Sequence, residues 1–487
     1  MKLSEILNNI KVIQVTGMVE TEIKNIEIDS REVRKNSMFV AIKGFKTDGH
    51  KFIGDAISKG ATAVVLENKD AIPEGFVAKN EFAQIIVENS RKALVEISHV
   101  FYNKPSTKLK LIGITGTKGK TTTSYFIKSV LDKLEIKNGL IGTNKYMVGD
   151  KEYSSELTTP EANKINYLMN EMVLNGCEYC VMEVSSHSIA LNRIDYLDFD
   201  FGVFTNITSD HMDFHKTFED YLETKKIFFT HLKPGAAVIV NSDDPNWQRI
   251  TDKTSAKVKT YGTKNNPDFR MSEIEYDLSG TKLTVSFNQK TYSLETKLIG
   301  KFNAYNATAA FSTLLLAGYD AGEVLEGIKQ TPQVPGRFEV IGKGNKKIII
   351  DYSHTADSLK EALLAIHHIV KDNRKIYTVF GCGGDRDRQK RPVMGKIAED
   401  LSDFVIVTSD NPRSEDPSAI IDEIKKGMSK DNHIIIEDRE EAIRYAVISS
   451  PEDAVVLVAG KGHENYQEIK GERKYFSDKE TALKYLN

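Results

Sequence analysis

The sequence predicts an α/β fold built from three domains. Short apolar runs alternate with stretches of helical period, a glycine-rich turn joins one apolar run to a helix, and 487 residues suit about three domains. Alternation of strands and helices is typical of a mostly parallel sheet covered by helices. We expect a small N-terminal α/β domain at 1–107, a central domain with a mostly parallel sheet at 108–333, and a C-terminal Rossmann-like domain at 334–487.

Each predicted domain has its own strand-like runs. In the first, runs at 38–42 and 63–66 flank a helix-like stretch at 52–59, and a linker at 102–106 ends the domain. In the second, strands are expected at 109–115, 180–184, 201–206 and 236–241. In the third, they are expected at 348–350, 377–380, 404–407 and 455–458, with a helical pattern at 359–370.

The composition excludes several classes of protein. Lys and Arg number 66 against 69 Asp and Glu, a near balance that gives no reason to expect a nucleic-acid partner. No apolar stretch approaches the roughly 18 residues that span a membrane, so no membrane insertion is expected, and the first residues lack the core of a signal peptide. The chain has 3 Cys, and the pair Cys177 and Cys180 is expected in a buried strand, since no second pair follows at zinc spacing. We expect a cytoplasmic monomer.

The strongest motif is a glycine-rich turn at 115–123, between a predicted strand and an amphipathic helix. Glycines let the backbone approach phosphate oxygens, and the helix N-terminus attracts an anion. Lys120 would reach the β- and γ-phosphates of ATP, and the Thr121 hydroxyl would hold Mg²⁺. Ile114 departs from the usual pattern, and the loop alone does not separate a kinase, a motor and a ligase. The predicted phosphate-binding residues are Gly116, Thr117, Lys118, Gly119, Lys120, Thr121 and Thr122.

This variant loop resembles that of the Mur ligases and of their relatives, the folylpolyglutamate synthetases. Further stretches similar to Mur ligase motifs follow in the family's order, at 182–187, 205–207, 210–213, 300–303 and 335–337. The resemblance implies an ATP-dependent ligase that extends the peptide stem of the bacterial cell-wall precursor. It also implies that Asn303, Arg337 and Asp351 contact the nucleotide across a domain boundary. Ala356 stands where the family usually has proline.

Carboxylate and hydroxyl groups near predicted strand ends indicate a metal site beside the phosphates. Glu183 ends one predicted strand, and His211 follows another. The resemblance adds a carbamylated lysine that orients Mg²⁺; family spacing assigns it to Lys225, although Lys226 is adjacent. The predicted metal set is Thr121, Glu183, His211 and Lys225, and the predicted catalytic set is Lys120, Lys225 and His211.

The resemblance places the uridine of the acceptor, UDP-MurNAc-L-Ala-D-Glu, on the first domain. The stretches 28–31 and 44–49 are similar to that region of the family, although both also suit ordinary polar turns. Leu191 stands where some relatives have glutamine, which puts one polar contact to the acceptor in question. The residues implied to bind the acceptor are Ser30, Thr158, Thr159, Ser185, Arg193 and Lys225.

Polar loops at 381–388, 409–413 and 460–464 each follow a predicted strand of the third domain, so we expect them at one edge of its sheet. Arg413 could clamp a carboxylate with two hydrogen bonds, and Glu464 could pair with an ammonium. The Asp-Asn-Pro-Arg run resembles the Mur branch that adds meso-diaminopimelate, and L-lysine is the alternative amino acid. The residues implied for diaminopimelate are Arg386, Asp410, Asn411, Pro412, Arg413, Gly460 and Glu464.

The resemblance also implies the reaction. ATP would phosphorylate the γ-carboxylate of D-Glu, and the amine of meso-diaminopimelate would attack the resulting acyl phosphate as the third domain closes. The sequence does not identify the base that deprotonates the amine. The competing interpretations are a folylpolyglutamate-synthetase-like ligase, a plain P-loop NTPase or kinase, and a non-catalytic UDP-sugar-binding protein.

Overall fold

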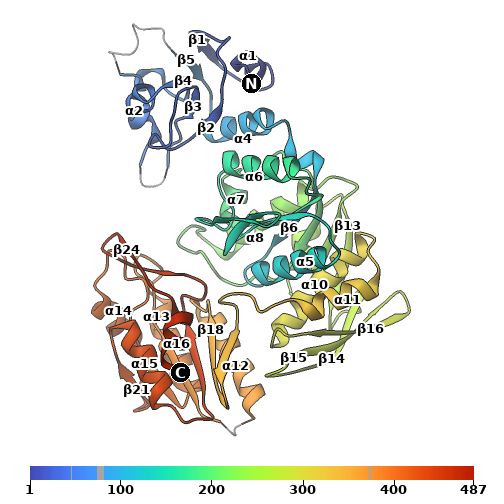
Figure 1. The fold of residues 1–487 in the computed structure, drawn as a ribbon, viewed down its shortest axis with the longest axis vertical. Coiled ribbons are helices and arrows are strands. Elements are labelled where there is room, and N and C mark those ends of the chain that lie inside the picture. Colours follow the sequence, from blue (N-terminus) through green and yellow to red (C-terminus); the bar gives the residue numbers. More distant parts are fainter. Residues whose placement is uncertain (45–46, 74–81, 372–373, 487) are drawn as a thin grey trace.

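The computed structural model describes residues 1–44, 47–73, 82–371 and 374–486. Within these residues the chain forms a five-stranded, an eleven-stranded and a six-stranded sheet, with one two-stranded ribbon. Figure 1 shows the three large sheets following one another from the N-terminal end of the molecule to the C-terminal part. Each has helices and its own apolar core, which is the predicted three-domain α/β architecture. The expected boundaries after residues 107 and 333 remain predictions.

The N-terminal domain is a small sheet with short helices. Its strand order is β1-β5-β4-β3-β2, parallel except for β1. The strands are β1 (Gln14–Thr16), β2 (Asn25–Glu27), β3 (Ser37–Val40), β4 (Ala61–Leu66) and β5 (Ala83–Ile86). The helices are α1 (Leu3–Leu7), α2 (Ile53–Ser58) and α4 (Ser90–Phe101), with 3-10 turns at Gly49–Phe52, Lys69–Ala71 and Pro105–Lys108. The predicted linker at 102–106 runs into the last of these turns.

The central domain contains the eleven-stranded sheet, in the order β16-β15-β14-β13-β12-β11-β6-β10-β7-β8-β9. Its parallel strands are β6 (Lys110–Thr115), β7 (Asn138–Ile141), β10 (Tyr179–Glu183), β11 (Phe199–Phe204), β12 (Ala237–Asn241) and β13 (Lys257–Gly262). One face is covered by α5 (Lys120–Lys133), α10 (Lys301–Leu316) and α11 (Ala321–Gln330). The other is covered by α6 (Ala162–Leu174), α7 (Ser186–Ala190), α8 (Phe218–Thr230) and α9 (Trp247–Thr251).

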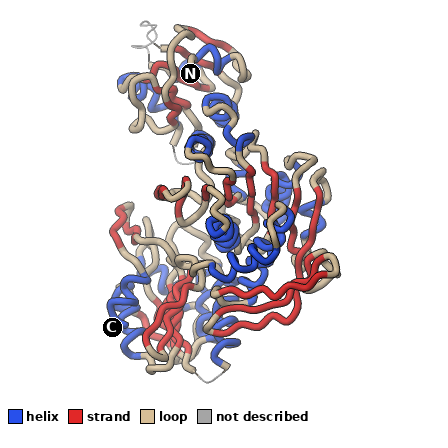
Figure 2. Tube along the Cα trace, turned by 45° about the vertical axis from the view of Figure 1, so that its right-hand side comes forward, coloured by secondary structure: helices blue, strands red, loops and turns tan. Residues whose placement is uncertain are grey.

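Further strands extend this sheet at both edges through antiparallel pairs, except that β14 joins β13 in parallel, and the sequence analysis did not predict them. They are β8 (Lys145–Val148), β9 (Lys151–Ser154), β14 (Phe269–Asp277), β15 (Gly280–Phe287) and β16 (Lys290–Thr296). Exposed residues interrupt the apolar pattern of β14, β15 and β16, whereas the predicted strands are continuous apolar runs buried on both faces. Figure 2 shows β14–β16 as a long ribbon; Tyr276 near its tip lies 4.2 Å, centroid to centroid, from His368.

The C-terminal domain has the strand order β17-β18-β22-β19-β20-β21, parallel except for β17. The strands are β17 (Glu339–Lys343), β18 (Lys346–Asp351), β19 (Ile376–Phe380), β20 (Phe404–Val407), β21 (His433–Ile435) and β22 (Val455–Ala459). The helices are α12 (Ala356–Val370), α13 (Lys390–Leu401), α14 (Pro417–Lys425), α15 (Arg439–Ser449) and α16 (Asp478–Leu486). The ribbon pairs β23 (Tyr466–Ile469) with β24 (Glu472–Tyr475). The predicted strands of this domain are all present, within a few residues.

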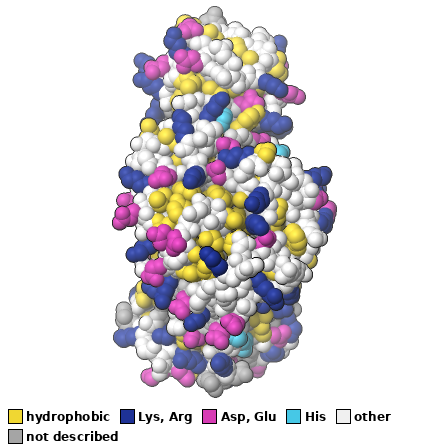
Figure 3. All heavy atoms as spheres, turned by 90° about the vertical axis from the view of Figure 1, so that its right-hand side faces the viewer, with side chains coloured by type: hydrophobic (Ala, Val, Ile, Leu, Met, Phe, Trp, Pro, Cys, Tyr) yellow, Lys and Arg dark blue, Asp and Glu magenta, His cyan; other side chains and the backbone are white. Residues whose placement is uncertain are grey.

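The surface carries mixed charge. On the face drawn in Figure 3, basic and acidic side chains are interspersed, and apolar side chains gather over the middle part of the molecule. This distribution agrees with the near balance of 66 basic and 69 acidic residues. Across the described ranges, the helices are all too short or too polar to cross a membrane.

Candidate active site

The glycine-rich turn at 115–123, called the phosphate loop below after its predicted ligand, lies between β6 and α5, as predicted. Gly116 and Gly119 have φ of +148° and +88°, and a Cβ on Gly116 would come within 1.9 Å of Thr205 Oγ1. Lys120 Nζ donates to the carbonyls of Gly116 (2.8 Å) and Thr117 (2.9 Å), and burial lowers the pKa of this lysine. The lysine therefore folds back over the loop, in position to exchange these carbonyls for phosphate oxygens.

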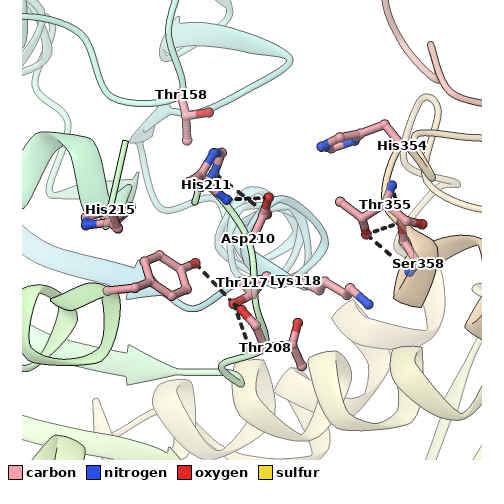
Figure 4. Close-up of polar contacts among 12 residues, drawn as sticks. Thr117, Lys118, Thr158, Thr208, Asp210, His211, His215, His354, Thr355 and Ser358 are labelled. Carbon is pink, nitrogen blue, oxygen red and sulfur yellow. Dashed lines mark hydrogen bonds and ion pairs between the residues drawn. The ribbon is translucent and has the colours of Figure 1, made fainter. Parts of the chain in front are cut away.

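Residues that follow β11 hold the loop in place. Thr205 Oγ1 donates to Lys118 O (2.6 Å), and Asn206 Oδ1 accepts from Lys118 N (3.0 Å). Thr117 Oγ1 donates to Thr208 O at 3.1 Å, a contact visible in Figure 4. The Thr-Asn pair after this strand thus fixes the backbone of the loop.

A buried carboxylate lies beside the loop. Glu183, at the end of β10, accepts hydrogen bonds from Thr121 Oγ1 (3.0 Å), Thr143 N (2.8 Å) and Thr143 Oγ1 (3.0 Å). These oxygen donors fit Mg²⁺, which takes few protein ligands and keeps water and phosphate oxygens for the rest. In the described part of the chain, no group of three or more His, Cys, Asp or Glu is arranged to hold a metal by itself. Thr121 and Glu183 offer two oxygen ligands, and phosphate oxygens and water would have to supply the others of a Mg²⁺ ion.

The structure distinguishes the two adjacent lysines of α8. Lys225 is 1% exposed, and its Nζ donates to Gly116 O at 3.1 Å. Burial, and next the charge of Lys120, lower its pKa well below the usual range. Lys226 instead pairs with Asp252 at 2.8 Å, and that hydrogen bond raises its pKa. Of the two, Lys225 is the one that faces the phosphate loop.

Imidazoles from two domains face one another in the site. Figure 4 shows His211 and Asp210 on the loop after β11, with His354 of the C-terminal domain opposite. His211 Nε2 lies 3.7 Å from Asp210 Oδ2, and its ring packs edge-on against His187 with centroids 4.9 Å apart. Burial lowers the pKa of His211 and lowers the pKa values of His187 and His354 to about 4. The lowered pKa favours the neutral form of His211, which lies against Asp210 and His187.

The three polar loops of the C-terminal domain follow β19, β20 and β22, at the carboxyl ends of neighbouring parallel strands. Arg413 has φ +53°, and its Nη1 donates to Gly384 O at 2.7 Å. Glu464 accepts from Asn411 Nδ2 (2.8 Å) and Lys461 Nζ (3.2 Å), and burial raises its pKa. This edge of the sheet therefore presents a guanidinium and a largely buried carboxylate, whose side chain is 14% exposed.

One cleft of about 480 Å³ joins the phosphate loop to these loops. The predicted site residues that line it are Thr117, Lys118, Gly119, Lys120, Thr121, Thr122, Thr158, Glu183, His211, Arg337, Arg386, Asp410, Asn411, Arg413, Gly460 and Glu464. The predicted residues outside its lining are Gly116, Ser30, Thr159, Ser185, Arg193, Lys225, Asn303, Asp351 and Pro412. The nucleotide and amino-acid candidates thus meet in one space.

Two arginines of the C-terminal domain reach the central domain across this cleft. Arg337 Nη2 donates to Thr121 Oγ1 at 3.1 Å, and its guanidinium lies 4.8 Å from the ring centroid of Tyr352. Arg386 Nη1 lies 3.3 Å from Asp213 Oδ2. The two walls of the cleft are therefore already in contact.

Two of the predicted nucleotide residues make contacts within the protein. Asn303 Nδ2 donates to Ile299 O at 2.9 Å, and Asp351 Oδ2 accepts from Phe338 N at 2.7 Å. Both side chains are thus anchored to nearby backbone, and their contact with the nucleotide stays a prediction.

The predicted acceptor residues of the central domain form a second group. Thr159 Oγ1 accepts from Ser185 N (3.1 Å), and Arg193 Nη1 donates to Thr159 O (3.0 Å). Arg193 also pairs with Glu161 at 2.6 Å, and Glu161 pairs with Arg91 of the N-terminal domain. Thr158 Oγ1 lies 3.1 Å from Thr143 Oγ1.

Ser30 lies in the N-terminal domain, away from these groups. It is buried, and its carbonyl accepts from Lys59 Nζ at 3.2 Å. In the stretch 44–49, Phe45 and Lys46 lie outside the described residues.

Sequence reasoning missed three residues of the site. Thr143 contacts Glu183 but follows β7, a strand that was not predicted. His354 and Lys461 lie within motifs that were noticed, but they were assigned no role. The position of each just after a parallel strand was the available signal.

Comparison with known proteins agrees with this geometry. Family models match residues 22–102 (Mur ligase family, catalytic domain), 114–314 (Mur ligase middle domain) and 336–462 (Mur ligase, glutamate ligase domain). A curated protein from Clostridium tetani, named UDP-N-acetylmuramoyl-L-alanyl-D-glutamate--2,6-diaminopimelate ligase, is 42% identical over 100% of this chain and 99% of its own length. The chain belongs to the Mur ligase family.

Solved structures of Mur ligases share the fold. One, titled as a UDP-N-acetylmuramoyl-L-alanyl-D-glutamate--2,6-diaminopimelate ligase, is 28% identical, with a TM-score of 0.68 over 100% of this chain and 98% of that one. A MurF ligase from Thermotoga maritima in complex with ADP is 20% identical, with a TM-score of 0.67 over 96% of this chain and 98% of that one.

In this Mur ligase the loop that carries Arg413 is anchored by a buried ion pair. Glu415 accepts from Arg391 Nη2 at 2.9 Å, and Arg391 is fully buried. The hydrogen bond from Arg391 lowers the pKa of Glu415 to about 2 from 4.5. The stabilisation is therefore fully present above pH 4.5 and is lost as the pH falls from there toward 2.

We expect Glu415→Gln to lower the free energy of unfolding by about 2 kcal/mol at pH 7, because the buried Arg391 loses one of its two carboxylate partners and keeps Glu423. The difference in unfolding free energy between the variant and the unchanged protein should be smaller at pH 3.5, because part of the stabilisation from Glu415 is already lost below pH 4.5. Urea unfolding at the two pH values measures this. Glu441→Gln, at an exposed pair with Arg444, is the matched control and should change little at either pH.

Proposed function

We propose that this Mur ligase joins meso-diaminopimelate to the γ-carboxylate of D-Glu in UDP-MurNAc-L-Ala-D-Glu, with ATP as the energy source. The observation that carries the proposal is the single cleft in which Lys120 and Glu183 lie on one wall and Arg413 and Glu464 on the other. The name of the relative that is 42% identical over the whole chain supports the same acceptor and amino acid.

The loop wall would hold ATP. The backbone N–H groups at the start of α5 face the phosphates, and Lys120 is positioned to neutralise charge on the γ-phosphate. Mg²⁺, held by Thr121 and Glu183 with the phosphates, would supply further charge neutralisation at the transferred phosphoryl group. The ADP complex of the related MurF ligase supports a nucleotide in this fold.

The proposed reaction takes place between the two walls of the cleft. An oxygen of the D-Glu γ-carboxylate attacks the γ-phosphorus, the bond to ADP breaks, and an acyl phosphate forms. The amine of diaminopimelate attacks the acyl carbon, inorganic phosphate leaves with the C–O bond electrons, and the nitrogen loses a proton. Arg337 and Arg386, which already bridge the walls, would help close the cleft and exclude water.

The amino-acid wall favours a substrate with two amino-acid heads. Arg413 offers a planar guanidinium to the distal carboxylate, and Glu464, oriented by the hydrogen bond from Asn411 Nδ2, offers carboxylate oxygens to the distal ammonium. L-lysine has no distal carboxylate and would leave Arg413 without a partner. The N-terminal domain and the Asp410–Arg413 run disfavour a folylpolyglutamate-synthetase-like acceptor.

A monomer is the proposed state of the enzyme. The use of ATP and a UDP-sugar as substrates supports a cytoplasmic location for the proposed reaction. Ser30, Thr158, Thr159, Ser185 and Arg193 are the proposed contacts of the acceptor.

We further propose that Lys225 is carbamylated. A neutral amine is required, since its lone pair bonds to the carbon of CO₂ with release of one proton, and the lowered pKa of Lys225 supplies that amine. The neighbouring positive charge of Lys120 would then favour the anionic product. With carbon-13-labelled bicarbonate, we expect a carbamate signal in the NMR spectrum that Lys225→Ala removes.

Lys226→Ala is the matched control, because the ion pair with Asp252 keeps that lysine protonated. Loss of the signal in the Lys226 variant alone would show that the wrong lysine had been assigned.

Phosphate release tests the proposed function. The purified protein is incubated with ATP, Mg²⁺ and UDP-MurNAc-L-Ala-D-Glu, with meso-diaminopimelate, L-lysine or neither. We expect release that requires diaminopimelate. Release with lysine but not with diaminopimelate would support a ligase but contradict the role of Arg413. Release without any amino acid would indicate a plain NTPase.

A further inference from the structure

The C-terminal helix is joined to the rest of its domain by a fully buried ion pair. Arg439, the first residue of α15, contacts Asp478, the first residue of α16, through Nε–Oδ1 and Nη2–Oδ2 distances of 2.7 Å each. Both side chains are 0% exposed. A charge pair at this depth is costly to desolvate, so its geometry must be well satisfied to persist.

The same guanidinium also contacts the backbone behind the amino-acid loops. Arg439 Nη2 donates to Ala459 O at 3.0 Å, and Nη1 reaches Ser409 O at 3.4 Å. Ala459 ends β22 immediately before Gly460, and Ser409 immediately precedes Asp410. One side chain is thus attached to the carboxyl ends of two strands that carry the proposed diaminopimelate residues.

The loop that contains Asp410 and the loop that contains Gly460 are closely packed against each other. Gly460 has φ +120°, and a Cβ there would come within 2.4 Å of Asp410 Oδ2. Movement of either strand end would therefore change the position of the other loop.

The charges around this point also suit the proposed substrate. The buried cations Arg439 and Lys461 face three carboxylates, those of Asp478, Asp410 and Glu464. Asp410 and Glu464 line the cleft, so their carboxylates are available to the distal ammonium of diaminopimelate.

We propose that Arg439 and Asp478 are positioning residues of the amino-acid site, so that the C-terminal helix is part of that site although it does not line the cleft. The inference rests on the proposed function, because it concerns how that function's amino acid is held. Arg439 fixes the carbonyls of Ser409 and Ala459, and Asp478 fixes the guanidinium of Arg439. Without the pair, the Asp410 and Gly460 loops lose their common anchor.

The test uses the full-length double variant Arg439→Met/Asp478→Leu. Replacing a whole buried ion pair with apolar residues usually preserves folding, whereas removing one partner leaves an unpaired charge. We expect KM for meso-diaminopimelate to rise about tenfold, with KM for ATP and for the acceptor within about twofold. Asp478→Asn, which keeps the shape of the side chain, is the second variant and should shift the same KM in the same direction.

Lys484→Ala is the matched control, since it breaks an exposed ion pair with Glu440 between the same two helices. It should leave all three KM values unchanged. A double variant with native far-UV circular dichroism and an unchanged KM for diaminopimelate would overturn the inference, as would an equal rise in all three KM values. Absence of diaminopimelate-dependent phosphate release in the unchanged protein would instead overturn the proposed function.

Discussion

Lys120→Ala is expected to lower kcat by about 10³-fold, the largest effect of any single substitution in this site. Lys120 already bends over the phosphate loop, where its Nζ donates to two loop carbonyls. When nucleotide binds, the same ammonium would stabilise the charge that develops on the transferred phosphoryl group. Steady-state phosphate release with saturating substrates measures the loss.

Lys133→Ala, an exposed lysine at the far end of the same helix, is the control and should retain full activity. Circular dichroism of both variants checks that α5 is intact. Activity of the Lys120 variant within about tenfold of the unchanged protein would contradict the placement of the γ-phosphate at this loop.

Arg413→Ala is expected to raise KM for meso-diaminopimelate about 100-fold, because a bidentate, charge-assisted pair with the distal carboxylate is lost. The side chain is held toward the cleft by its hydrogen bond to Gly384 O. Use of L-lysine, which has no distal carboxylate, should change much less, so the ratio of kcat/KM values for the two amino acids should fall.

Arg413→Lys separates charge from geometry, because lysine keeps the positive charge but cannot form the two parallel hydrogen bonds. It should recover only part of the lost affinity. Arg473→Ala is the matched control: this arginine is exposed on β24 and pairs with Glu468. An equal loss for diaminopimelate and lysine in the Arg413 variant would show that the residue supports the loop rather than the substrate.

The parts of the fold that the sequence predicts share one property. The predicted parallel strands are continuous apolar runs, because both of their faces are buried, and each is followed by a polar loop at the same edge of its sheet. That rule was enough to predict Asp410 and Glu464 at one edge of the third domain's sheet and Glu183 beside the glycine-rich loop of the central domain, but only the structure shows that the two edges share a cleft. The strands β14–β16 do not follow this rule, because exposed residues interrupt their apolar pattern.

Other features depend on contacts that no local pattern records. Successive residues of a helix point about 100° apart, so the choice between Lys225 and Lys226 depends on where the phosphate loop and Asp252 lie. Arg439 appears in the sequence as an ordinary charged residue at a helix start, and its partner Asp478 lies 39 residues later. Its role becomes visible only when both strand ends are in place.

A crystal structure of the protein with ADP and the product of the proposed reaction, UDP-MurNAc-L-Ala-D-Glu-meso-diaminopimelate, tests the central claim most directly. We predict the ADP phosphates on the N–H groups of the loop beside Lys120, and the distal carboxylate of diaminopimelate on Arg413. A nucleotide outside the loop, or an amino acid bound away from Arg413 and Glu464, would contradict the account of a single cleft that brings the two together.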